Sequence, residues 1–212
     1  MKVITSLLLC SQFIAPHVPH FAYSTFHKPK PYPSINIKNL TTQVAHLKNN
    51  SIAPIDNNSL IIIQAIKDLK SVPGFWPTLE TYFNKKNQNE PHFAKGALFE
   101  IETAHRFRNT ILGMNMYVRY QDLCRQFDLV AYHENGDNKI FGECKDINWE
   151  KANYYADTRE KLKQQFLDQQ KLVAMLNKLY RSKNEYQLFS KNRLCPAWKL
   201  WLDKQAIKYV ET

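Results

Sequence analysis

The feature that most constrains the fold is a pair of apolar segments, residues 127–132 and 139–145, that flank Asn135-Gly136. Asn-Gly between two strand-forming segments is the strongest short-range signal for a turn that joins antiparallel strands. We therefore predict a β-hairpin, with its two strands over these ranges. Because side chains alternate between the faces of a strand, Glu143 and Lys145 are expected on one face and Cys144 on the other.

The segments around the hairpin predict further helices and strands. Residues 93–110 lack Pro and repeat apolar residues at helical spacing, and residues 158–181 have the pattern of a long amphipathic helix. The other predicted elements are strands at 111–120, 186–190 and 207–210, a helix opened by Pro196, and upstream helices at 60–69 and 77–83. This order predicts an α/β fold with a mixed central sheet flanked by helices.

The chain divides into three segments by composition. Residues 1–36 combine an apolar N-terminal segment with a Pro-rich linker, residues 37–90 predict a mostly helical or irregular extension, and residues 91–212 hold the main domain. The apolar run 3–15 is too short to span a bilayer, so no stable membrane span is expected. No good signal-cleavage sequence follows it, which favours a cytoplasmic location, although secretion through an N-terminal signal stays open.

The charge of the chain is unevenly distributed. The formal net charge is +10, with 9 Lys+Arg against 4 Asp+Glu in residues 1–90 and 13 against 6 in residues 151–212. Residues 91–150 have 7 against 9 and are therefore acidic. Carboxylates in the middle and cations on the flanks suit a metal site that acts on a phosphate backbone, although charge segregation by chance is an equal alternative.

Cysteine and glycine content excludes several kinds of site. The four cysteines are widely spaced and form no C-x-x-C pair, which argues against a structural zinc site. Five glycines, without a G-x-G-x-x-G or Walker A sequence, argue against a Gly-rich phosphate-binding loop.

Glu100 is a charged residue at an apolar position of the predicted helix 93–110. The buried face of this helix is expected to contain Phe93, Ala97, Ile101, Ala104 and Phe107. Glu100 lies on or beside this face, whereas Glu102 and Arg106 are expected in solvent. Because burying an unpaired carboxylate is costly, Glu100 needs a cation, a hydrogen-bond network or a raised pKa. A boundary Glu that reaches water is the alternative.

The hairpin supplies a second acidic cluster. Pairing of its strands is expected to bring Asp128 near Glu143 and Lys145. Two carboxylates about 4 Å apart repel by roughly 4 kcal/mol near a protein surface. A divalent cation between them would reverse this repulsion, and hard oxygen ligands suit Mg²⁺. A cross-strand salt bridge facing solvent is the alternative for Glu143 and Lys145.

Together these residues resemble a known family. Glu100 on a helix, then Asp128 and Glu143-Cys144-Lys145 across a hairpin, then a long helix, a strand, a helix and a strand, are similar to the PD-(D/E)XK nucleases over residues 91–212. Phe127 replaces the Pro of the motif. The resemblance implies a restriction-endonuclease-like fold, with Asp128, Glu143 and Glu100 binding Mg²⁺ or Mn²⁺ and Lys145 assisting catalysis.

The same resemblance suggests substrate contacts on the long helix. Gln165 and Gln169 lie on or next to its apolar face, where many members of the family place a Gln near the active centre. A structural role at the helix boundary is the alternative for both. Lys161 and Lys163 are further candidates for substrate binding, since they belong to a series of basic residues on this helix.

The function expected from the sequence is metal-dependent hydrolysis of phosphodiester bonds by an endonuclease. DNA is favoured over RNA as the partner, although an RNA-cleaving or toxin-type nuclease stays open. A catalytically inactive nucleic-acid-binding module of the same fold is the second hypothesis, and homodimerisation is left open.

Overall fold

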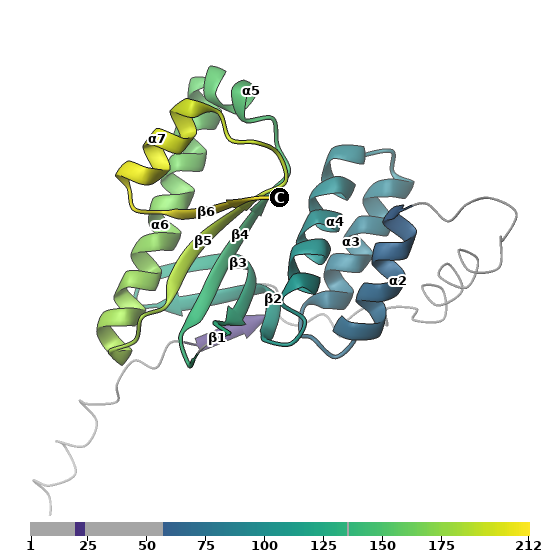
Figure 1. Ribbon diagram of the computed structural model, residues 1–212, viewed down its shortest axis with the longest axis horizontal. Coiled ribbons are helices and arrows are strands. Elements are labelled where there is room, and N and C mark those ends of the chain that lie inside the picture. Colours follow the sequence, from purple (N-terminus) through teal and green to yellow (C-terminus); the bar gives the residue numbers. More distant parts are fainter. Residues whose placement is uncertain (1–19, 24–56, 135) are drawn as a thin grey trace, which may run out of the picture.

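The fold is α/β, with a six-stranded mixed sheet and helices on both of its faces (Figure 1). The computed structural model describes residues 20–23, 57–134 and 136–212. The strands are β1 His20–Tyr23, β2 Ile111–Tyr120, β3 Leu123–Tyr132, β4 Lys139–Lys145, β5 Glu185–Ser190 and β6 Lys208–Glu211. The helices are α2 Asn57–Leu69, α3 Phe75–Asn87, α4 Pro91–Arg106, α5 Trp149–Tyr154, α6 Ala156–Tyr180 and α7 Pro196–Lys204.

The sheet has an antiparallel half and a parallel half. Strands follow the order β1-β2-β3-β4-β5-β6, with antiparallel pairing from β1 to β4 and parallel pairing from β4 to β6. The predicted hairpin is confirmed, because β3 pairs antiparallel with β4 from Leu129↔Gly142 to Tyr132↔Lys139. Asn135 itself lies outside the described residues. The parallel half places the carboxyl ends of β4, β5 and β6 at one edge, where polar side chains of α/β folds often form sites.

One face of the sheet packs against α6 and α7. The buried residues of this layer include Phe127 and Phe141 from the sheet, Phe166 from α6 and Trp198 from α7. The ring of Trp198 lies edge-on to that of Trp149, with centroids 5.2 Å apart. Trp198 is therefore a core residue, because it is only 1% exposed.

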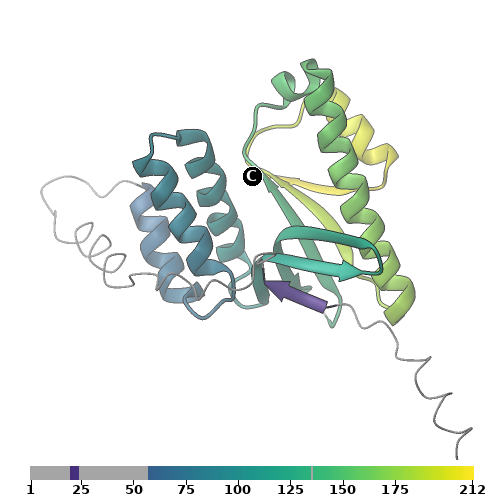
Figure 2. The ribbon, with the colours of Figure 1, turned by 180° about the vertical axis from the view of Figure 1, so that it is seen from behind.

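The opposite face carries α4, and α2 and α3 pack on α4 as a three-helix layer (Figure 2). Phe99 of α4 packs against Leu129 and Cys144 of the sheet. Gly74 precedes α3 with a φ of 82°, and a Cβ at this position would lie 1.9 Å from the carbonyl oxygen of Met114. Only Gly permits this close approach of the α3 start to β2, because any side chain would overlap the backbone.

Four sequence predictions are corrected by the structure. Residues 20–23, assigned to an extended linker, form β1 and pair with β2. Helix α5 was not predicted; its six residues begin after Asn148, whose side chain accepts a hydrogen bond from Lys151 N.

Phe93, expected in the core, is 67% exposed. Glu102, expected in solvent, is half-buried and pairs with Lys191.

Residues 1–19 and 24–56 lie outside the described residues, and so do the expectations for the apolar N-terminal segment and for most of the Pro-rich linker. Among the helices that the structure describes, none has the length and apolar character needed to cross a bilayer.

Candidate active site

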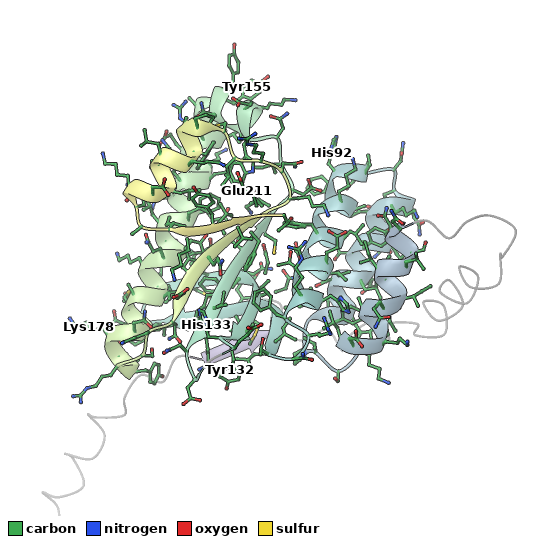
Figure 3. The ribbon with its side chains drawn as sticks, viewed as in Figure 1. His92, Tyr132, His133, Tyr155, Lys178 and Glu211 are labelled. Atoms are coloured by element: carbon green, nitrogen blue, oxygen red, sulfur yellow. The ribbon has the colours of Figure 1, made fainter. Side chains whose placement is uncertain are left out.

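Glu100, Asp128, Glu143 and Lys145 converge at the carboxyl end of β4. Glu100 comes from α4, Asp128 from β3, and Glu143 and Lys145 from β4. They are close enough that the charges of Glu143 and Lys145 influence the pKa values of both Glu100 and Asp128. Figure 3 shows where this edge lies, near the His92 tip of α4 and opposite the hairpin residues Tyr132 and His133.

Glu143 is fixed by two amides of α6. Gln165 Nε2 donates to Glu143 Oε1 at 2.7 Å, and Gln169 Nε2 donates to Glu143 Oε2 at 2.6 Å. The Lys145 ammonium also donates to Glu143 Oε1. Glu143 is only 2% exposed, so these charge-assisted bonds compensate for the loss of water around its carboxylate.

The orientation of Gln169 is set by Tyr186. Tyr186 Oη donates to Gln169 Oε1 at 2.8 Å, which directs the amide nitrogen of Gln169 toward Glu143 and the carbonyl oxygen of Gln126. Burial, followed by repulsion from Glu143 and Asp128, holds the pKa of the Tyr186 hydroxyl well above its usual value. Tyr186 is therefore a protonated donor at neutral pH, and this chain of bonds holds Glu143 in one orientation.

Asp128 lies on β3 across from the end of β4. Its Oδ2 accepts a hydrogen bond from the backbone N–H of Cys144 at 2.7 Å. Burial raises the pKa of Asp128 well above its usual value, and repulsion from Glu143 and Glu100 raises it further. These surroundings disfavour the ionised form of Asp128, and a nearby cation would favour it.

Glu100 completes the acidic cluster from the helical side. Burial is the main cause that raises the pKa of Glu100 from 4.5 to about 7, and repulsion from Glu143 adds to it. A hydrogen bond from Asn115 Nδ2 to Glu100 Oε2, 2.9 Å long, opposes the shift. Glu100 therefore has a hydrogen-bond partner and a raised pKa, two of the compensations expected for a carboxylate at this position.

Asn115 is a site residue that the sequence analysis missed. It lies in β2 with a φ of 51°, and its amide nitrogen also donates to Thr78 Oγ1 of α3 at 2.8 Å. Asn is one of the few residues that adopts a left-handed conformation readily. A lone Asn between Met114 and Met116 was the available signal, because a polar residue interrupts an apolar strand there.

Lys145 contributes a positive charge that lowers the pKa values of both Glu100 and Asp128. Burial alone would lower the pKa of Lys145, but attraction to Glu143 and Asp128 outweighs burial and raises it. Lys145 therefore remains a protonated ammonium at neutral pH while these carboxylates are ionised. In this state it can stabilise negative charge or orient a water molecule, but it cannot accept a proton.

The cluster opens into a cavity of about 580 Å³ between the helical layer and the sheet. Glu100 and Lys145 line its inner end, while Lys85, His92 and Phe93 line the part formed by α3 and α4. A cavity of this size is within the usual range for ligand sites in proteins.

Glu100, Asp128 and Glu143 are the acidic residues of the site that could hold a divalent cation. Across the part of the chain that the structure describes, no three His, Cys, Asp or Glu side chains are already arranged as metal ligands. Both Glu143 oxygens accept hydrogen bonds from amide donors. The chemistry of Glu100, Asp128 and Glu143 nevertheless fits a hard cation, because these carboxylates repel one another and offer oxygen ligands.

The two lysines expected to bind substrate do not line the cavity. Lys163 lies 3.4 Å from Glu160 Oε1, and its ammonium is 5.7 Å from the ring centroid of Trp201 in α7. The structure therefore directs Lys163 away from the cluster. Lys161 is exposed and lies one turn before Gln165 on the same side of α6.

Comparison of the chain with models of protein families, with curated protein sequences and with solved structures gave no match. The functional assignment therefore depends on the geometry and chemistry of the site.

Proposed function

We propose that this protein is a metal-dependent nuclease with a restriction-endonuclease-like fold, and that it hydrolyses phosphodiester bonds, in DNA rather than RNA. The observation that carries this proposal is the convergence of Glu100, Asp128, Glu143 and Lys145 from three separate elements. Three carboxylates with unfavourable mutual repulsion are costly to maintain near one another. This repulsion is explained if the carboxylates hold a cation that acts on a phosphate group.

The proposed roles follow from the environment of each side chain. Asp128 and Glu143 would hold Mg²⁺, with Glu100 completing the site, and Mn²⁺ would substitute. When bound, the cation supplies Lewis-acid polarisation of the phosphate and lowers the pKa of a bound water. Lys145 stabilises charge on the phosphate in the transition state or orients the attacking water, because its raised pKa keeps it an ammonium.

Gln165 and Gln169 are positioning residues in this proposal. Both donate to Glu143 rather than facing the cavity, so they fix the carboxylate instead of contacting the substrate. Partners of this kind typically change metal affinity or activity by 10- to 100-fold when they are removed.

The charge of the chain also supports a polyanionic substrate. The net charge of +10 favours association with nucleic acid, while the acidic residues are concentrated in the segment that forms the cluster.

A nucleic-acid-binding module without activity is the second candidate. It is favoured by one observation, namely that both Glu143 oxygens are engaged by Gln165, Gln169 and Lys145. If these bonds persist in the presence of Mg²⁺, both acceptor positions of Glu143 Oε1 are occupied, and only one position on Oε2 stays open to the cation.

The test is incubation of the purified protein with supercoiled plasmid and with total RNA, in Mg²⁺, Mn²⁺ or EDTA. We expect metal-dependent plasmid nicking, reduced at least about 100-fold in Glu143→Ala. Degradation of RNA alone would support the proposed mechanism with RNA, not DNA, as the substrate. Absence of cleavage of both would support the inactive module.

A further inference from the structure

Phe93 is a large apolar side chain that the fold leaves at the edge of the candidate active site. It lies in the first turn of α4, next to the His92 position in Figure 3, and is 67% exposed. Ala97, one turn further along α4, is only 4% exposed. Burial along this helix therefore stops before Phe93, and the ring lines the cavity that also contains Glu100 and Lys145.

Three of the α4 residues that line the cavity follow one another along one side of the helix. Phe93, Gly96 and Glu100 are separated by three and four residues, which places them on one side of the helix. A Cβ added at Gly96 would meet no atom within 4 Å, so the space between the ring and the carboxylate is open. Seven residues of helix span about 10 Å, which corresponds to about three nucleotide steps along a stacked strand.

The surroundings of Phe93 suit a nucleotide better than an apolar ligand. Lys85 Nζ lies 5.3 Å from the ring centroid and also pairs with Glu90 Oε2 at 2.6 Å. The aromatic ring is thus accompanied by a cation that can reach a phosphate. Aromatic rings beside cations are the usual means by which proteins hold single-stranded nucleic acid.

We propose that Phe93 stacks on an unpaired nucleobase and that the cavity takes a nucleotide of single-stranded DNA, which makes a single strand the preferred substrate over an intact duplex. This inference rests on the proposed function for the adjacent catalytic cluster. Bases inside a duplex are covered on both faces by their neighbours, so only an unpaired base has a face free to stack on Phe93. Gly96 leaves room for the sugar and phosphate between the ring and Glu100.

The experiment measures binding without cleavage. Fluorescence anisotropy in EDTA compares a labelled single strand with the same sequence as a duplex, for the wild type, Phe93→Ala, Phe93→Trp and Tyr180→Ala. Tyr180 is a matched control because it is an exposed aromatic at the far end of α6. We expect tighter binding of the single strand, and a loss of about 5- to 150-fold in Phe93→Ala. Phe93→Trp and Tyr180→Ala should bind like the wild type.

Gly96→Leu tests the open space independently. Leu favours a helix more than Gly does, and a Cβ at this position meets no atom within 4 Å, so the variant is expected to be at least as stable as the wild type. It should nevertheless lose affinity for the single strand because it fills the cavity. Wild-type affinity in a folded Gly96→Leu, equal effects of Phe93→Ala and Tyr180→Ala, or a preference for duplex would each overturn the inference.

A parallel cleavage assay in Mg²⁺ separates this inference from the proposed function. Single-strand binding that depends on Phe93, without any cleavage, would support the stacking role of Phe93 and contradict the proposed nuclease activity. Cleavage that is unchanged in Phe93→Ala would keep the nuclease and overturn the stacking role.

Discussion

Gln165 and Gln164 are neighbouring residues with different roles. Gln165 donates to Glu143, whereas Gln164 is exposed and donates to Asp168 Oδ1 at 2.8 Å. Gln165→Leu is expected to lower metal-dependent cleavage by about 10- to 100-fold, because Glu143 loses one of the bonds that orient it. Gln164→Leu is the matched control. The measurement is the steady-state cleavage rate of each variant. Equal rates for Gln165→Leu and Gln164→Leu would refute the positioning role of Gln165.

Glu100 gives the metal-free protein a specific dependence of stability on pH. Its pKa is raised from 4.5 to about 7 in the folded state, mainly by burial. Its contribution to stability is therefore fully present below about 4.5 and is lost as the pH rises through about 7. We expect the free energy of unfolding to increase on acidification from pH 8 to pH 5, by on the order of 2 kcal/mol.

Urea unfolding of the wild type and of Glu100→Gln in EDTA measures this effect. The difference between the wild type and Glu100→Gln reports the contribution of Glu100. The free energy of unfolding of Glu100→Gln should depend less on pH. Asp68, Glu160 and Asp168 have lowered pKa values, so their contributions are lost only at more acidic pH and do not mask the change. Parallel pH profiles for the two proteins would contradict the prediction.

At the scale of elements, the junction between Gly74 and β2 determines where the helical layer meets the sheet. Gly74→Ala introduces a Cβ at a φ of 82°, directly against the carbonyl oxygen of Met114. We expect a loss of on the order of 3 kcal/mol in stability, measured by urea unfolding. Gly96→Ala is the matched control. Its Cβ meets open space, and the substitution replaces a Gly inside a helix, so we expect stability to be unchanged or raised by up to about 1 kcal/mol.

The elements that the sequence predicted are those with a strong local signal. Helix α6, the β3–β4 hairpin and the Pro196 helix each have a clear periodicity or a turn or capping residue. Helix α5 has only six residues, too few for periodicity, and β1 is a strand because the edge of β2 pairs with it. Local sequence patterns do not predict strand pairing between residues about 100 positions apart.

The same limit applies to single residues. Glu143 and Lys145 were identified because alternation along one strand places them together. Asn115 was missed because its role depends on Glu100 and Thr78, which lie on two other elements. Phe93 continues the helical apolar pattern, but its ring is 67% exposed and lines the cavity instead of the core.

At the scale of the whole molecule, the site depends on both layers of helices. The α6 layer holds Glu143 through two amides, while the opposite layer supplies Glu100 and the Thr78 that holds Asn115. The sheet between them supplies Asp128 and Lys145. The cluster therefore forms only when both faces of the sheet are packed, which explains why the extension before residue 91 belongs to the architecture of the site.

The most direct test of this account is a calorimetric titration of the purified protein with Mg²⁺ and Mn²⁺, beside Asp128→Asn. Asp128→Asn removes one charge from a repelling cluster and is nearly isosteric, so it should fold with at least wild-type stability. We expect saturable binding by the wild type and its loss in Asp128→Asn. A wild type that binds neither cation, or an Asp128→Asn variant that binds them equally well, would contradict the claim that these carboxylates form a metal-dependent catalytic site.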